Sequence, residues 1–262
     1  MMLTLLDAPL APPLLAASLA IVLAAGVVRG FAGFGFSAIS VAGLSLWVSP
    51  AKVVPAVFVL EVLASLGLLR SALPHVDWQW LGWLILGNAL CIPLGLQLLA
   101  WLPETPLRLL VGALLLLGAI ALRSGFALGL RATRTARLGV GLVSGLVNGI
   151  AAIGGIAVAV LLNASALPPA TMRATMIALF LFTDLYALAW AALLAHAAPV
   201  ALAGSDTLRW ALWLTPAMLV GIWLGQRGFA GVSPARFRQR VLELLMALSA
   251  LTVGQAALAL LG

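Results

Sequence analysis

Charged residues are scarce in this chain. Of its 262 residues, 8% are charged and 64% are hydrophobic, and the mean hydropathy is +1.20. Soluble domains carry about 25% charged residues, so this chain has too little polar surface to face water on all sides. We therefore expect an all-α, polytopic membrane protein. The net charge of +7 does not indicate nucleic acid binding, because most arginines lie in short loops between apolar runs.

Residues that carry catalytic or metal chemistry are also few. The single cysteine, Cys91, lies inside an apolar run, which excludes a disulfide framework and a thiolate metal site. The chain has no His-Glu-x-x-His pattern and no Gly-x-x-x-x-Gly-Lys-Ser/Thr phosphate-binding loop. We therefore expect no enzyme activity, no cofactor and no ATPase unit within the chain.

Apolar runs fill most of the chain, and many reach the roughly 17 to 25 residues that cross a bilayer. Two of the runs are interrupted by glycines. The runs cover residues 14–48, 53–69, 78–99, 107–122, 138–166, 172–194, 208–224 and 241–261. The first and the fifth of them contain the interruptions.

The two interruptions are copies of one pattern. The first reads RGFAGFGFS at positions 29–37, and the second reads NGIAAIGGI at positions 148–156. A shift of 119 positions places Gly30 on Gly149 and, further on, Pro50 on Pro169. Internal repeats of this kind are typical of transporters. We therefore predict two membrane repeats, residues 1–126 and 127–262, that together form one transport domain.

The positive residues indicate how the two halves are oriented. If all eight segments crossed the membrane, Lys and Arg would be distributed without bias. If each broken segment is a re-entrant pair, most Lys and Arg residues lie on the same side of the membrane as the loop at 131–137, as the positive-inside rule requires. Each half then has a broken, re-entrant helix followed by three transmembrane helices, and the halves are inverted. A kinked full crossing is the alternative for the first segment, because residues 14–28 are nearly long enough to span alone.

The breaks predict a binding site for an anion. A broken membrane helix leaves backbone groups that protein, water or a ligand must satisfy, and each following half-helix turns its N-terminus toward the break. Glycine lets an oxyanion approach the backbone; the alternative is that these glycines only allow close helix packing. The predicted substrate-binding residues are Arg29, Gly30, Gly33, Phe34, Gly35 and Ser37, with Asn148, Gly149, Ile153, Gly154 and Gly155 in the second copy.

Four polar residues near the breaks have distinct expected roles. Arg29 offers a planar fork to sulfite, sulfonate or carboxylate oxygens, and Asn148 offers a neutral donor; alternatively, Arg29 snorkels to an interface or caps carbonyl groups. Glu61 and Asp184 are the carboxylates well inside predicted spans, where ionisable groups usually line a functional cavity. Burial disfavours their charged forms, so we expect them to exchange protons. A static ion pair of Glu61 with Arg29 is the alternative.

The whole pattern resembles the TauE/SafE family of sulfite and organosulfonate exporters. The similarity rests on the duplicated breaks, on Pro50-Ala51 and Pro168-Pro169 after them, and on the turn from Arg70 to Trp78. It implies a transporter of small sulfur-containing or carboxylated anions in the bacterial inner membrane, often outward and coupled to protons. The two inverted repeats predict a secondary transporter that works by alternating access. The expected partners are therefore a small anionic substrate, protons and the lipid bilayer. A passive anion channel or a non-transporting partner subunit is the alternative, and the oligomeric state is left open, with a homodimer as one option.

Overall fold

The computed structural model describes residues 8–124, 133–163, 167–194, 202–227 and 234–261. These residues form only helices and the turns between them. The helices are α1 (Pro12–Ala32), α2 (Phe36–Leu44), α3 (Pro50–Ala72), the 3-10 helix η2 (Leu73–His75), α4 (Trp78–Trp101), α5 (Glu104–Arg123), α6 (Arg134–Ala151), α7 (Gly154–Asn163), α8 (Pro169–Leu194), α9 (Ser205–Gln226) and α10 (Pro234–Leu261). The expected all-helical fold is confirmed.

Seven helices among the described residues are long and apolar enough to cross a membrane. They are Pro12–Ala32, Pro50–His75, Trp78–Trp101, Glu104–Arg123, Pro169–Leu194, Ser205–Gln226 and Gln239–Leu260. The expectation of a multi-pass membrane protein is therefore confirmed. Helix α1 has spanning length before its break, whereas α6 begins with Arg134 and Arg137 and offers a shorter apolar stretch.

Local sequence signals explain where several helices begin. Pro50 stands at the first position of α3, where proline loses no helical hydrogen bond. Asp77 caps α4, and its Oδ1 accepts hydrogen bonds from the backbone N–H groups of Gln79 and Trp80, both at 3.0 Å. The turn from Arg70 to Trp78 is therefore the corner between α3 and α4.

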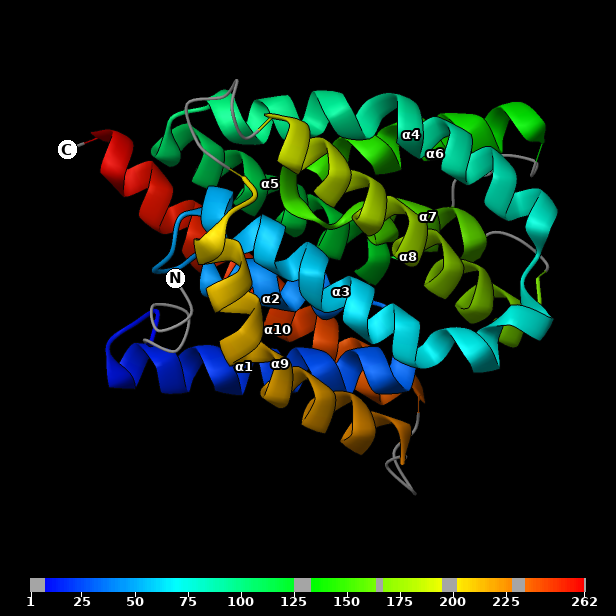
Figure 1. The fold of residues 1–262 in the computed structure, drawn as a ribbon, viewed down its shortest axis with the longest axis horizontal. Helices are drawn as coiled ribbons and strands as arrows, with labels where there is room; N and C mark the ends of the chain where they lie inside the picture. Colours follow the sequence, from blue (N-terminus) through cyan, green and yellow to red (C-terminus); the bar gives the residue numbers. More distant parts are fainter. Residues whose placement is uncertain (1–7, 125–132, 164–166, 195–201, 228–233, 262) are drawn as a thin grey trace.

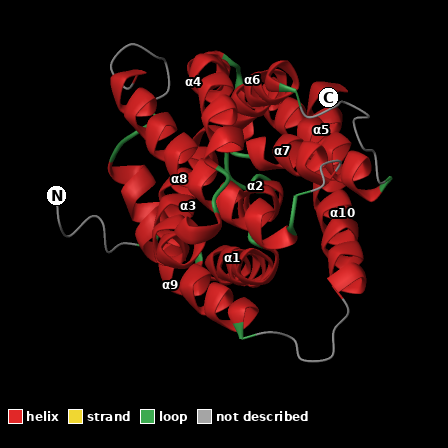
Figure 2. Ribbon diagram, turned by 90° about the vertical axis from the view of Figure 1, so that its right-hand side faces the viewer, coloured by secondary structure: helices red, strands yellow, loops and turns green. Residues whose placement is uncertain are grey.

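The two short helices lie at the centre of the bundle. Figure 2 shows α2 and α7 in the middle, with α4 and α6 above them and α1 and α9 below. Helix α1 packs against α9, α4 against α6, α3 against α8, and α5 against α10, and Figure 1 shows these helices running alongside one another. Every residue of α2 is buried. The segments that follow the breaks are therefore enclosed by the long helices.

Glycines allow the two closest helix crossings. A Cβ atom on Gly30 would overlap the carbonyl oxygen of Ile222 in the α1–α9 crossing, and one on Gly149 would overlap that of Ile92 in the α4–α6 crossing. Small residues permit such backbone contact in membrane bundles. Gly30 and Gly149 therefore lie in helix crossings, which is the packing arrangement named above as the alternative to ligand contact.

The outer surface of the bundle is apolar. Leu117, Leu193 and Leu258 are each more than 60% exposed, and many other leucines also face outward. Soluble monomers rarely expose contiguous apolar patches of more than a few hundred Å². Such a surface suits contact with lipid chains.

Candidate functional site

Both predicted helix breaks are present, and they have the same backbone geometry. Helix α1 ends with Gly33 at φ 81°, and the Gly33 N–H donates to the carbonyl oxygen of Arg29 at 2.8 Å. Helix α6 ends with Ala152 at φ 56°, and its N–H donates to the carbonyl oxygen of Asn148 at 2.7 Å. The two residues of each pair correspond under the shift of 119. A left-handed cap therefore terminates both helices.

Ala152 adopts a conformation that favours glycine, because a Cβ atom in the left-handed region costs roughly 1–2 kcal/mol. We expect Ala152→Gly to relieve this conformational cost. This gain in stability should offset the stability that is lost with the buried methyl group. Ala151→Gly is the matched control, since Ala151 is also buried but lies within α6. Thermal unfolding in detergent should show Ala151→Gly less stable than Ala152→Gly by about 1 kcal/mol or more. Equal stability of the two variants would contradict the strained cap.

Arg29 is fully buried and is paired inside the protein. Its Nη2 lies 3.2 Å from Oε2 of Glu61 and donates to the Ser65 hydroxyl at 2.9 Å, while Nη1 donates to the Gly33 carbonyl. Oε1 of Glu61 accepts from the Ser37 hydroxyl at 2.8 Å and from its backbone N–H at 3.3 Å. The ion pair named above as the alternative is therefore present in this conformation. The Glu61 carboxylate also occupies the N-terminus of α2, where the sequence predicted an external anion.

Asn148 organises the second break without a charge. Its Nδ2 donates to Oδ1 of Asp184 at 3.1 Å, and its Oδ1 accepts from the Gly154 N–H at 3.3 Å. The Ser144 hydroxyl donates to the Gly154 carbonyl at 3.0 Å. Oδ2 of Asp184 is buried and has no hydrogen-bond partner among the described residues. The second break thus contains a buried carboxyl group that is only half satisfied.

The polar pairs at the two breaks occupy corresponding places. Arg29 bonds to Ser65, and Asn148 bonds to Asp184, each across 36 positions. The carboxylate at the first break comes instead from Glu61, one helical turn before Ser65. The breaks therefore share a backbone arrangement but differ in charge.

Phe180 connects the two breaks. The Arg29 guanidinium carbon lies 4.7 Å from the centroid of its ring, and a Cβ atom on Gly155 would overlap the same ring. One helical turn later on α8, Asp184 interacts electrostatically with both Glu61 and Arg29. Helix α8 thus joins the first and second breaks in one cluster. The spacing of four residues from Asp184 is the sequence signal that places Phe180 on the same face of α8.

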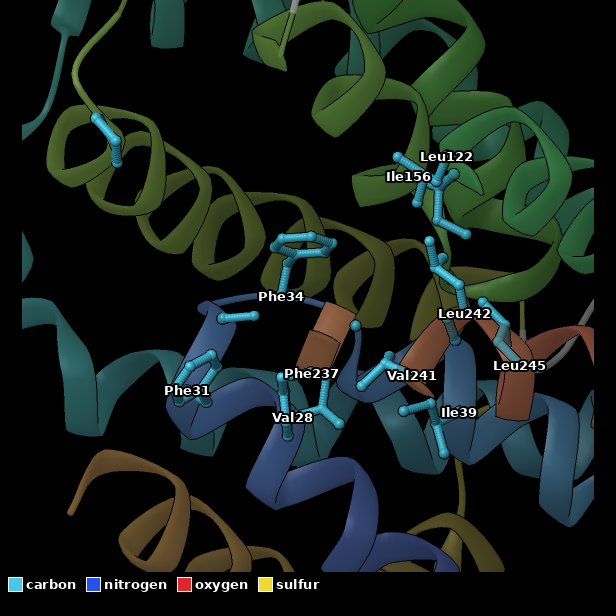
Figure 3. Close-up of a pocket in the computed structure, with 14 residues that line it drawn as sticks. Val28, Phe31, Phe34, Ile39, Leu122, Ile156, Phe237, Val241, Leu242 and Leu245 are labelled. Atoms are coloured by element: carbon cyan, nitrogen blue, oxygen red, sulfur yellow. The ribbon is translucent and has the colours of Figure 1, made fainter. Parts of the chain in front are cut away.

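A cavity of about 470 Å³ lies beside this cluster. Figure 3 shows Phe34 and Ile156 on its wall, with Val241 and Leu242 of α10. Gly35 also lines it, so two predicted residues of the first break face the cavity, whereas Ile153 is buried without lining it. The walls are almost entirely apolar. The cavity provides room next to the charged cluster but little polarity of its own.

The family model of the sulfite exporter TauE/SafE matches residues 18–253. The chain belongs to the TauE/SafE family. Comparison with curated proteins and with solved structures gives no match. TauE/SafE proteins are membrane transporters of sulfite-like anions and are not enzymes. Family membership therefore confirms the resemblance, the expectation of membrane transport and the expectation that the chain is not an enzyme.

One further cation of this TauE/SafE protein reaches the first break. Arg173 of α8 donates from Nη2 to the carbonyl oxygen of Gly30 at 3.1 Å. A Cβ atom on Gly33 would lie 2.5 Å from Cγ of Arg173, so the side chain covers the break closely. In the sequence, Arg173 resembles the arginines near the ends of apolar runs that indicate topology. Its reach across to α1 is a tertiary contact that the sequence does not reveal.

Proposed function

We propose that this TauE/SafE protein is a secondary transporter that exports a small anion across the bacterial inner membrane. Sulfite, an organosulfonate or a related carboxylate is the cargo. The observation that carries the proposal is the pair of broken helices whose polar residues meet in one buried cluster around Phe180. Secondary transporters commonly bind their substrates at discontinuous helices of this kind.

An inverted repeat supports alternating access in this proposal. Helices α1 to α5 of the first half correspond to α6 to α10 of the second. The contact of α1 with α9 therefore corresponds to the contact of α6 with α4. In the α3–α8 and α5–α10 contacts, each helix packs against its own counterpart. In Figure 1, α3 runs from left to right, whereas α8 runs from right to left. Helix α2 also packs back against α1, as expected for a re-entrant pair. Rocking of one half against the other would expose the cluster to each side of the membrane in turn.

Glu61 provides the proton coupling in this mechanism. Its carboxylate holds the Arg29 guanidinium and the Ser37 donors, which are the groups that an anion would require. A proton on Glu61 neutralises it and frees these donors, so anion and proton bind together. A doubly charged anion carried with one proton leaves a net negative charge on the complex, and the inside-negative membrane potential favours its outward movement. Asp184 passes this same proton to and from Glu61, because its Oδ2 is buried and unpartnered among the described residues.

Counterflow in proteoliposomes tests the proposal. Vesicles loaded with unlabelled sulfite should take up labelled sulfite to a transient level above equilibrium, because a carrier exchanges one anion for another. A passive channel would give uptake without the overshoot, and a non-transporting partner subunit would give no uptake. Protein-free vesicles provide the background. Absence of an overshoot would contradict the transporter assignment.

A further inference from the structure

We propose that Arg173 is the specificity residue that captures the substrate anion at the mouth of the path to the first break. This inference rests on the proposed transport function. The anion would first contact Arg173, which belongs to the second half of the chain. Arg173 lies next to the break of the first half.

The surroundings of Arg173 form an entrance that carries several polar side chains. A cavity of about 280 Å³ lies between the end of α3, the start of α8 and the end of α9. Arg173 lines it together with His75, Gln226 and Ser71, which are all exposed. The guanidinium is half-buried and bonds to Gly30 in the last turn of α1. Arg173 therefore connects an accessible cavity with the backbone of the break.

Arg29 is not available for the first contact with the anion in this conformation. It is completely buried, and Glu61 neutralises its charge at 3.2 Å. Among the described residues, Arg173 by contrast has no carboxylate within ion-pair distance, and it donates instead to the neutral Gly30 carbonyl. A half-buried guanidinium without a counterion attracts an anion with a planar fork of donors.

The neighbouring charges favour an anion here rather than a cation. Arg173 and Arg29 repel one another electrostatically, so an anion near Arg173 relieves repulsion between two guanidinium groups. The residue that corresponds to Arg173 in the first half is Val54, which is fully buried. The corresponding place at the second break therefore has no arginine. This asymmetry gives the two ends of the transport path different affinities for the anion.

Capture follows directly from the contacts of Arg173. An arriving oxyanion accepts hydrogen bonds from the guanidinium and replaces the Gly30 carbonyl as its partner. Because the side-chain stem lies over Gly33, the release of Gly30 moves the group that covers the break. The anion can then pass inward to Arg29 and Ser37 when Glu61 is protonated. Selection thus takes place before the buried pair opens.

The role of the Arg173 charge can be tested by replacing it chemically on an introduced cysteine. Only one native cysteine, Cys91, has to be removed first. In a Cys91→Ser background, Arg173→Cys is measured for sulfite counterflow before and after modification of the introduced thiol. We expect KM for sulfite to rise by about tenfold, which corresponds to about 1.4 kcal/mol, because the charge-assisted hydrogen bonds of the guanidinium are lost. Attachment of an aminoethyl group through a thioether, which sulfite does not cleave, should restore KM to within about threefold of the parent, and attachment of a sulfonatoethyl group through a thioether should not. Arg209→Cys, which removes an arginine ion-paired within α9, is the matched control and should leave KM unchanged.

Two variants that need no thiol modification show whether Arg173 contacts the substrate or only caps α1. Arg173→Gln keeps an N–H donor but lacks the charge, whereas Arg173→Lys keeps the charge. We expect KM to rise about tenfold in Arg173→Gln and to remain within about threefold in Arg173→Lys. Equal KM values in these two variants, or equal effects of the two thiol reagents, would overturn the inference.

A binding measurement keeps this inference distinct from the transport proposal. In detergent, where no flux is involved, sulfite should slow the modification of the thiol introduced by Arg173→Cys relative to that introduced by Arg209→Cys in the same solution, which corrects for direct reaction of sulfite with the reagent. If sulfite protects the thiol but the Cys91→Ser parent shows no counterflow, transport is contradicted and capture by Arg173 is supported. If the parent transports sulfite and sulfite does not protect the thiol, capture by Arg173 is contradicted and transport is supported.

Discussion

Glu61→Gln should lower the stability of the anion-free protein by about 3–5 kcal/mol, because it leaves the buried Arg29 guanidinium without its countercharge. Glutamine can still accept the Ser37 hydrogen bonds, so the loss arises mainly from the charge. Sulfite should restore much of this stability by taking the place of the carboxylate at Arg29. Unfolding midpoints measured in detergent over a series of sulfite concentrations would check both effects.

The double variant Glu61→Gln with Arg29→Met provides the control for this result. It removes both charges together, so it should recover most of the lost stability and should not respond to sulfite. If Glu61→Gln were as stable as the wild type, the ion pair at 3.2 Å would contribute little. If the variant were destabilised but insensitive to sulfite, Glu61 would not hold the place of the anion.

Asp184→Asn should reduce sulfite uptake driven by a proton gradient at least about tenfold, while counterflow stays within about threefold of the wild type. The asparagine keeps an oxygen that accepts the Asn148 hydrogen bond but cannot exchange a proton. Because counterflow needs no net proton movement, it should survive. Uptake after an imposed pH step and counterflow without one, measured on the same vesicles, would separate the two activities.

Asp206→Asn is the comparison for Asp184→Asn. Asp206 lies in the first turn of α9 and is mostly exposed, so its neutralisation should leave both activities unchanged. Normal gradient-driven uptake by Asp184→Asn would remove Asp184 from the coupling mechanism. Loss of both activities would assign Asp184 to anion binding or folding instead.

The positions of the helix breaks could be predicted from the sequence because their cause is local. Glycine at position 33 and polar residues at 29 and 148 interrupt otherwise apolar runs, and the structure ends α1 and α6 at these places. The second break shows that glycine is not strictly required, since Ala152 adopts the same left-handed cap. The repeated pattern around that residue, rather than its own identity, indicated the break.

The contacts between segments could not be predicted in the same way. The sequence predicts that Arg29 and Asn148 contact a ligand, with an Arg29–Glu61 ion pair as the alternative, and in the structure Glu61 and Asp184 satisfy them inside the protein. Which distant helix approaches a break depends on packing, and an apolar sequence with many leucines does not specify this. For the same reason Phe180, which joins both breaks, was not identified from sequence.

Locating the bound anion tests the central claim most directly. Selenite is a heavier analogue of sulfite, and its anomalous scattering would mark its position in crystals of the protein. We expect a peak between the two breaks, within hydrogen-bond distance of the Arg173 or Arg29 guanidinium. Selenite bound only at the lipid-facing surface, or only in the α4–α6 crossing, would contradict an anion site formed by the broken helices.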